Sequence, residues 1–170
     1  MYCPKQIPFF PLPKSPTAHG GILGAGKRKS ARPVCAKRSM HVVLRAERAR
    51  GRYSLLIPRN AKAIHHLLKK YAKQFEVSIY EFANVGTHLH CLLRAKTKAG
   101  FRNFLRVFSG QVAQQVTGAK PGNPLKKRFW DLLAYSRVVE WGRAFQIAEK
   151  YVRKNILQAS RLMPFYPIRW

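Results

Sequence analysis

Acidic residues are scarce in this chain: 6 Asp and Glu accompany 33 Lys and Arg among 170 residues, which gives a formal net charge of +27. An excess of this size indicates the kind of partner more than the fold, because cationic surfaces attract polyanions. Basic residues occur along the whole chain, so we expect contacts with phosphates that weaken as salt is raised. The charge fits an enzyme that acts on nucleic acid as well as an architectural protein that only binds it.

Cysteines are few, and long apolar runs are absent from the sequence. Cys3, Cys35 and Cys91 are odd in number and show no CxxC spacing, which argues against a disulfide framework and a zinc knuckle. There is no run of about 18 apolar residues, so we expect no membrane-spanning helix. Prolines interrupt the apolar residues 7–13, unlike the core of a signal peptide. We therefore predict a cytoplasmic protein without a membrane partner.

Composition divides the chain into three parts. Residues 1–38 contain no acidic side chain but many prolines, glycines and basic residues, so we expect a basic, irregular and disordered tail. A basic arm that reaches DNA is the alternative for this part. Residues 39–160 carry the periodic apolar pattern of one folded domain, and residues 161–170 are expected to form a C-terminal tail.

The apolar pattern of the folded domain predicts four strands and three helices. The expected strands are 40–46, 77–82, 88–95 and a strand-like stretch at 129–140, with a further short strand or an extended loop at 53–57. Asn60 is expected to cap the first helix, Thr97 to open the second, Gly118 to end it, and the third helix to span 142–159.

The resulting order, β-α-β-β-α-β-α, predicts an α+β fold of the ferredoxin-like (RRM-like) type. This sandwich has an antiparallel sheet with helices on one face, to which the C-terminal helix is added.

His88 and His90 form the sharpest local motif, within the strand expected at 88–95. Residues i and i+2 of a strand point to the same face, so both imidazoles should project together while Leu89 and Cys91 enter the other side. Two neutral imidazoles held side by side provide half of a divalent-metal site. Two surface histidines without a ligand are the alternative, and Cys91 is better interpreted as a small buried hydrophobe.

Tyr151 lies in the helix expected at 142–159, one turn before Asn155 on the same side. If this helix packs over the sheet, a phenol and a carboxamide could face the histidine pair. A half-buried boundary tyrosine is the alternative. The basic residues around Tyr151 are Lys150, Arg153 and Lys154. They are candidates for contacts with DNA phosphates, or they form a solvated face.

A basic loop precedes this helix. Its cations Lys126, Lys127 and Arg128 are further candidates for DNA binding. Phe129 and Trp130 follow directly, and they either stack a base or belong to the core.

Together these parts resemble the IS200/IS605-type single-tyrosine (HUH) transposases, in particular the REP-associated tyrosine transposase-like group. The resemblance covers residues 40–158 and is carried by the segments MHVVLRA, GTHLHCLL, FRNFLRVFSGQVAQQVTG and AEKYVRKN. It implies that His88 and His90 bind a metal, that Asn155 is the third ligand, and that Tyr151 is the nucleophile. It also implies that residues 39–160 form an IS200-like catalytic domain.

The same resemblance implies DNA transposition with Mg²⁺ or Mn²⁺ as cofactor. Tyr151 would attack a phosphodiester of single-stranded or hairpin DNA, leaving a 5′-phosphotyrosine on the protein and a free 3′-hydroxyl. Whether the protein forms a homodimer, with its site completed in trans, is left open.

Two other functions also stay open. A catalytically inactive nucleic-acid-binding module on the same fold explains the charge but leaves the histidine and tyrosine motifs accidental. A replication-initiator-like nuclease shares the histidine pair and the tyrosine, although no helicase region accompanies them in this sequence.

Overall fold

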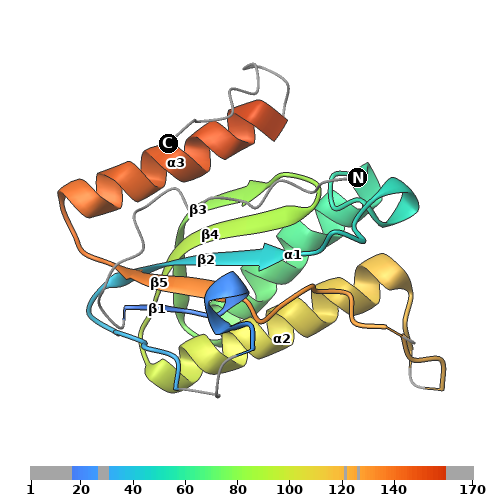
Figure 1. The fold of residues 1–170 in the computed structure, drawn as a ribbon, viewed down its shortest axis with the longest axis horizontal. Helices are drawn as coiled ribbons and strands as arrows, with labels where there is room; N and C mark the ends of the chain where they lie inside the picture. The colour runs from blue at the N-terminus through green and yellow to red at the C-terminus, as the bar shows by residue number, and fades with distance from the viewer. Residues whose placement is uncertain (1–16, 27–30, 121, 126, 160–170) are drawn as a thin grey trace.

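The computed structural model describes residues 17–26, 31–120, 122–125 and 127–159, and their arrangement is shown in Figure 1. The strands are β1 (Ala18–His19), β2 (Ser39–Arg45), β3 (Val77–Asn84), β4 (His88–Ala95) and β5 (Tyr135–Val139). The helices are α1 (Pro58–Gln74), α2 (Lys98–Thr117) and α3 (Arg143–Ala159), with short 3-10 segments at η1 (Gly21–Gly24) and η2 (Gly51–Tyr53). None of the described helices is long and apolar enough to cross a membrane.

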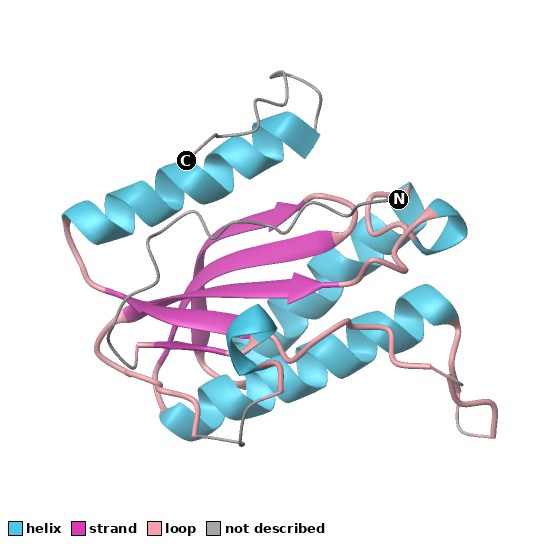
Figure 2. Ribbon diagram, in the orientation of Figure 1, coloured by secondary structure: helices cyan, strands magenta, loops and turns pink. Residues whose placement is uncertain are grey.

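The strands form one antiparallel sheet in the order β1-β5-β2-β4-β3. Without β1, this is the ferredoxin-like arrangement, in which β4 lies between β2 and β3. Helices α1 and α2 cover one face of the sheet, and α3 crosses the opposite face (Figures 1 and 2). The predicted α+β fold class is therefore confirmed.

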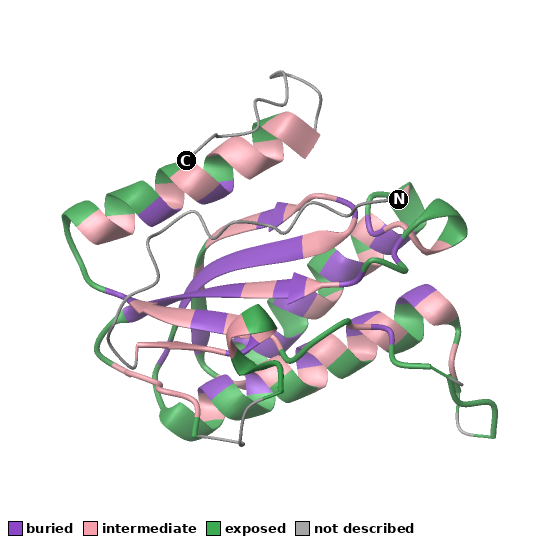
Figure 3. Cartoon of the chain, in the orientation of Figure 1, coloured by how far each residue is buried: buried purple, intermediate pink, exposed green. Residues whose placement is uncertain are grey.

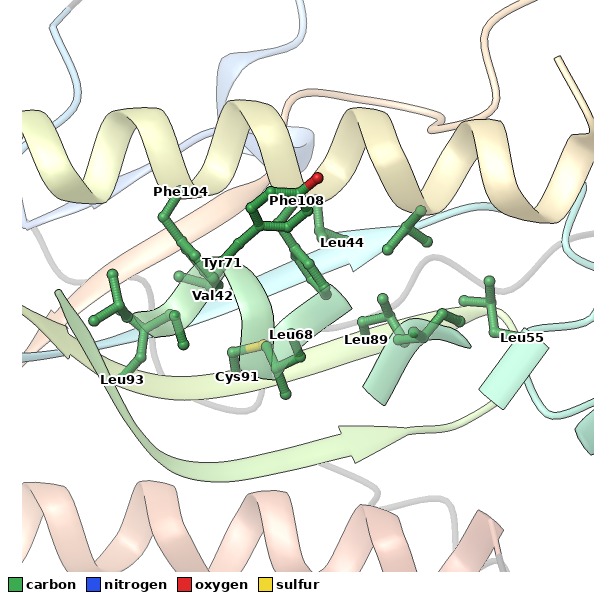
Figure 4. Close-up of a cluster of buried hydrophobic side chains, with 14 of the residues drawn as sticks. Val42, Leu44, Leu55, Leu68, Tyr71, Leu89, Cys91, Leu93, Phe104 and Phe108 are labelled. Carbon is green, nitrogen blue, oxygen red and sulfur yellow. The ribbon is translucent and has the colours of Figure 1, made fainter. Parts of the chain in front are cut away.

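The main core lies between the sheet and the α1–α2 layer (Figures 3 and 4). Every second residue of β2 and β4 belongs to this core, because successive side chains of a strand point to opposite faces of the sheet. The core residues from β2, β4 and α2 include Met40, Val42, Leu44, Leu89, Cys91, Leu93, Phe104 and Phe108. Cys91 is 2% exposed, as predicted for a small buried hydrophobe, and burial raises the pKa of its thiol to about 12.

Helix α2 begins after Thr97 and ends before Gly118, as the sequence predicts. The Oγ1 atom of Thr97 accepts a hydrogen bond from the Gly100 amide at 2.9 Å, which satisfies a free donor of the first turn. At the other end Gly118 adopts a left-handed conformation with φ of 74°, a conformation that glycine reaches without a steric penalty.

The start of α1 differs from the prediction. The helix begins at Pro58, whose fixed φ suits a first helical position, so Asn60 is not the cap. Asn60 is instead 4% exposed, and its Nδ2 donates to the carbonyl oxygens of Ser54 at 2.8 Å and Arg52 at 3.4 Å. The possible strand at 53–57 is absent: Tyr53 ends η2, and residues 55–57 form a turn and a bend.

The strand-like stretch at 129–140 is only partly a strand, because β5 begins at Tyr135. Phe129 is 5% exposed and belongs to the main core. Trp130 packs edge-on against it at 4.9 Å, and its Nε1 donates to the Ser109 carbonyl oxygen at 2.9 Å. This packing supports the core interpretation of the two aromatics over base stacking.

Part of the segment expected as an irregular tail belongs to the sheet. Strand β1 pairs with β5, Ala18 opposite Arg137, and the Arg32 guanidinium donates to Ser136 Oγ and, at 2.8 Å, to the Ala134 carbonyl oxygen. Residues 1–16 and 27–30 of this segment lie outside the described residues. Single-sequence patterns miss β1 because two residues show no periodicity.

Gly20 provides a test of this docking. Its φ is +81°, and a Cβ atom at this position would lie 2.2 Å from the Ala134 carbonyl oxygen. We expect Gly20→Ala to lower the free energy of unfolding by about 1–3 kcal/mol, as measured by urea denaturation. The control is Gly24→Ala, since no atom lies within 4 Å of a Cβ there. Equal stability of the two variants would show that the segment does not dock as described.

Candidate functional site

The second face of the sheet carries the candidate site. The pairing of β2 with β4 places Val43 opposite His90 and Arg45 opposite His88. Because Leu89 and Cys91 point into the core, both histidines point to the face that α3 covers. The same-face prediction for the His-x-His motif therefore holds in the structure.

Helix α3 is anchored on this face by two contacts. Ala148 packs with Leu92 and Val139 in a small second cluster, and Arg153 Nε forms an ion pair with Glu81 of β3 at 2.7 Å. These contacts turn the neighbouring stripe of α3, which carries Tyr151, toward the histidines.

Tyr151 meets the histidine pair directly. Its ring centroid lies 5.7 Å from that of His90, edge-on at 76°, and the His88 and His90 rings lie 6.2 Å apart at 24°. The structure thus brings together three of the four residues that the sequence suggested for the chemistry, all from one chain.

Asn155 is joined to Tyr151. Its Nδ2 donates to the Tyr151 carbonyl oxygen at 2.9 Å. The structure places Asn155 beside the nucleophile candidate, one helical turn onward. Its role as a metal ligand stays a prediction.

His41 is the site residue that sequence reasoning missed. It lies on β2 with a ring centroid 5.7 Å from His90, nearly parallel at 13°, and 5.8 Å from Tyr151, edge-on at 85°. The available signal was the alternation of β2: Met40 and Val42 enter the core, so His41 between them must face the other side.

All three imidazoles are held neutral by their surroundings. Burial is the main cause and lowers the pKa of His41 to about 4, with a further contribution from Arg137. Burial, followed by the charge of Arg45, lowers the pKa of His88 to about 4. The pKa of His90 is well below its ordinary value for the same reason, with His41 and His88 adding to the effect. Neutral imidazoles can accept hydrogen bonds or coordinate a cation.

The nitrogen atoms of the pair fit a metal. Thr87 Oγ1 lies 2.8 Å from His88 Nδ1, a bond that fixes the ring and leaves Nε2 for a ligand. His88 Nε2 and His90 Nδ1 are buried without a hydrogen-bond partner among the described residues, and such orphaned atoms in a polar site suggest a missing ion or water. Within the same ranges, no three His, Cys, Asp or Glu side chains are grouped to hold a metal.

The Tyr151 phenol is largely protonated at neutral pH. Burial raises its pKa, while the side-chain hydrogen bond with Asn155 acts in the opposite direction. Attack by this oxygen therefore requires loss of the phenol proton at the site.

The predicted DNA-binding cations differ in their exposure and in their contacts with the rest of the chain. Lys127 and Arg128 are exposed, and their carbonyl oxygens accept from Arg48 Nη1 at 3.2 Å and 3.1 Å, which holds the basic loop against the chain that leaves β2. Lys126 lies outside the described residues. Arg45, the last residue of β2, pairs with His88. Because Arg48 follows shortly after it, the basic loop lies near the end of the sheet that carries His88.

On α3, Lys150 is exposed and Lys154 half-buried. Arg153 is engaged by two carboxylates: besides Glu81, it pairs with Glu149 at 3.1 Å. Arg153 therefore has a structural role in docking α3, whatever it contributes to DNA binding.

The fold and the site together define a class: ferredoxin-like α+β domains that present a histidine pair and a helix-borne tyrosine on one sheet face. Residues 35–155 match the family described as "Transposase IS200 like". The chain belongs to this family of IS200-like transposases.

One solved structure supports the fold, and a second gives a lower score. A REP-associated tyrosine transposase bound to a REP hairpin superposes with a TM-score of 0.57 at 18% identity, covering 85% of this chain and 91% of that one. A Deinococcus radiodurans R1 protein described as a candidate transposase gives a TM-score of 0.46 at 19% identity, covering 75% and 98%. None of the curated proteins matches the chain significantly in sequence.

The buried imidazoles predict a specific pH dependence of stability. His41 and His88 have pKa values of about 4 when folded and about 6.5 when unfolded. Between these values the unfolded chain binds more protons, so stability is retained above pH 6.5 and is lost as pH falls toward 4.

For His41 alone, we expect the free energy of unfolding to fall by up to about 1.4 kcal/mol for each pH unit between pH 6.5 and 4. Urea unfolding of metal-free protein at several pH values measures it, and His41→Leu should flatten the curve. Parallel curves for the two proteins would contradict the burial of a neutral His41.

Proposed function

We propose that this protein cleaves and rejoins single-stranded DNA in transposition, with Tyr151 as the nucleophile. The observation that carries the proposal is the contact of the Tyr151 ring with His90, the inner member of the histidine pair, at 5.7 Å. A protein that only binds nucleic acid has no need to bury the imidazoles of His41 and His90, which are 5% and 4% exposed. Each carries a ring nitrogen without a hydrogen-bond partner among the described residues, and such buried polar atoms destabilise the fold.

His88 and His90 would hold a divalent cation, Mg²⁺ or Mn²⁺, and Asn155 would supply a carboxamide oxygen as third ligand. Bound there, the cation would act as a Lewis acid that polarises the scissile phosphate. The support is the neutral state of the imidazoles and the orphaned His88 Nε2 and His90 Nδ1 atoms.

The chemistry of Tyr151 is a transesterification. Its phenol oxygen bonds to phosphorus while the bond from phosphorus to the 3′-oxygen breaks, so a 5′-phosphotyrosine and a 3′-hydroxyl result. The phenol proton is lost as the leaving oxygen gains one, so the charges balance. Attack by another 3′-hydroxyl on the phosphotyrosine rejoins DNA without ATP, because the bond energy is kept in the covalent link.

The substrate proposal rests on charge. Each of the six acidic residues takes part in an ion pair: Glu47, Glu76, Glu81, Asp131, Glu140 and Glu149. Most of the 33 basic residues therefore have no protein carboxylate to pair with and are available for phosphates. Binding of a REP hairpin by the structural neighbour supports single-stranded or hairpin DNA as the partner.

We also propose that the site is complete within one chain. His90, His41 and Tyr151 of the same molecule are already in contact, so exchange of α3 between two copies is not required. A homodimer would then serve to bring two DNA ends together and would not be needed to complete the site.

The first test replaces Tyr151 by phenylalanine. Tyr151→Phe removes one hydroxyl and keeps the ring contacts, so the fold should persist while the covalent adduct with a single-stranded oligonucleotide disappears. Denaturing gel electrophoresis of labelled DNA detects the adduct. The control is Tyr80→Phe, because Tyr80 lies on the same side of the sheet and is 38% exposed. An undiminished adduct in the Tyr151→Phe protein would show that another residue is the nucleophile.

The second test removes the proposed metal ligands. The double variant His88→Ala, His90→Ala, or EDTA with the unchanged protein, should abolish adduct formation. DNA affinity should change little, because Lys and Arg provide it. The matched control is His65→Ala, His66→Ala, which alters two exposed histidines of α1. Full cleavage by the double variant or in EDTA would exclude the metal role.

A further inference from the structure

We infer that His41 is a positioning residue: its imidazole holds the Tyr151 phenol at the angle at which it faces the His88–His90 pair. The inference rests on the proposed function of Tyr151 and extends it to a residue outside the predicted site.

His41 lies at the centre of the site face. It stands opposite Arg137 of β5 and Leu92 of β4 in the sheet, and it is 5% exposed. Its ring is therefore enclosed by the sheet below and α3 above, with little freedom to change rotamer.

Two aromatic contacts link His41 to the proposed chemistry. Its ring is nearly parallel to that of His90, with the centroids 5.7 Å apart, and it meets the Tyr151 ring edge-on at 85° and 5.8 Å. A third ring, Tyr135, closes the far side at 6.4 Å and 74°. His41 thus contacts both a proposed ligand and the proposed nucleophile, which also contact each other, and its shape limits how either ring can rotate.

Filling the space with an apolar side chain would not require a histidine at position 41. His41 Nε2 is buried without a hydrogen-bond partner among the described residues, and an unsatisfied buried group of this kind costs about 1–3 kcal/mol. An aliphatic side chain such as Leu would avoid that cost. A flat ring is what His offers and Leu lacks, and flatness is the property that both the stacked and the edge-on contact use.

Loss of this flat ring should therefore misplace the phenol without unfolding the protein. A nucleophile displaced by about 1 Å loses on the order of a hundredfold in rate, since in-line attack depends on geometry. Affinity for DNA should be preserved, because His41 is only 5% exposed and exposed Lys and Arg side chains are expected to provide the affinity.

The experiment compares His41→Leu, which fills the space without a flat ring, with His41→Phe, which keeps one. Adduct formation is measured in single turnovers with saturating single-stranded DNA and Mn²⁺, together with DNA affinity and thermal unfolding. We expect His41→Leu to be slower by about 10- to 100-fold at unchanged affinity, and His41→Phe to remain within about fivefold of the unchanged protein. His65→Leu, an exposed histidine of α1, is the matched control and should have no effect.

Ring flipping of Tyr151 gives a readout that does not depend on activity. In ¹³C-tyrosine-labelled protein, assigned with Tyr151→Phe, the Tyr151 ring should flip faster in His41→Leu and at the original rate in His41→Phe. If the unchanged protein forms no adduct, the proposed function fails, while the flip rates still test the positioning role.

Full adduct rates and unaltered ring flips in a folded His41→Leu protein would overturn the inference. So would a folded His41→Phe protein as slow as His41→Leu, because the polar atoms rather than the flat ring would then matter. If His41→Phe fails to fold, the comparison of His41→Leu with the unchanged protein decides.

Discussion

The two-residue alternation of β2 and β4 is the constraint on which the rest of the structure depends. On one face these strands supply Met40, Val42, Leu89 and Cys91 to the core beneath α1 and α2. Every side chain between them must then face the other way. The same alternation that builds the core therefore gathers His41, His88 and His90 on the second face. A shift of one residue in the register would bury the imidazoles in the core and expose the core residues.

The second face needs a cover, because it carries apolar residues such as Leu92 and Val139. Helix α3 provides it through Ala148 and Val152, both buried, and through the Arg153–Glu81 ion pair. Since Tyr151 lies beside this anchored stripe, the docking of α3 also fixes the position of the phenol. Burial then keeps the imidazoles neutral, the protonation state that metal coordination requires.

Local spacing was enough to predict what a single strand or helix determines. The i, i+2 histidines, the i, i+4 pair Tyr151 and Asn155, and both ends of α2 follow from the geometry of one element. His41 was missed because its role depends on pairing with β4, far away in the sequence, and β1 was missed because its only support is β5. Asn60 was misassigned because Pro58 also suits a helix start, and only tertiary hydrogen bonds distinguish the two.

The proposed role of the histidine face, closed by α3, is to bind a divalent cation next to Tyr151. Crystals grown with Mn²⁺ and a single-stranded oligonucleotide, measured at the manganese absorption edge, would locate such a cation. We expect an anomalous peak within coordination distance of both His88 and His90, on the side that faces Tyr151. Manganese bound elsewhere on the protein, with this face empty, would contradict it.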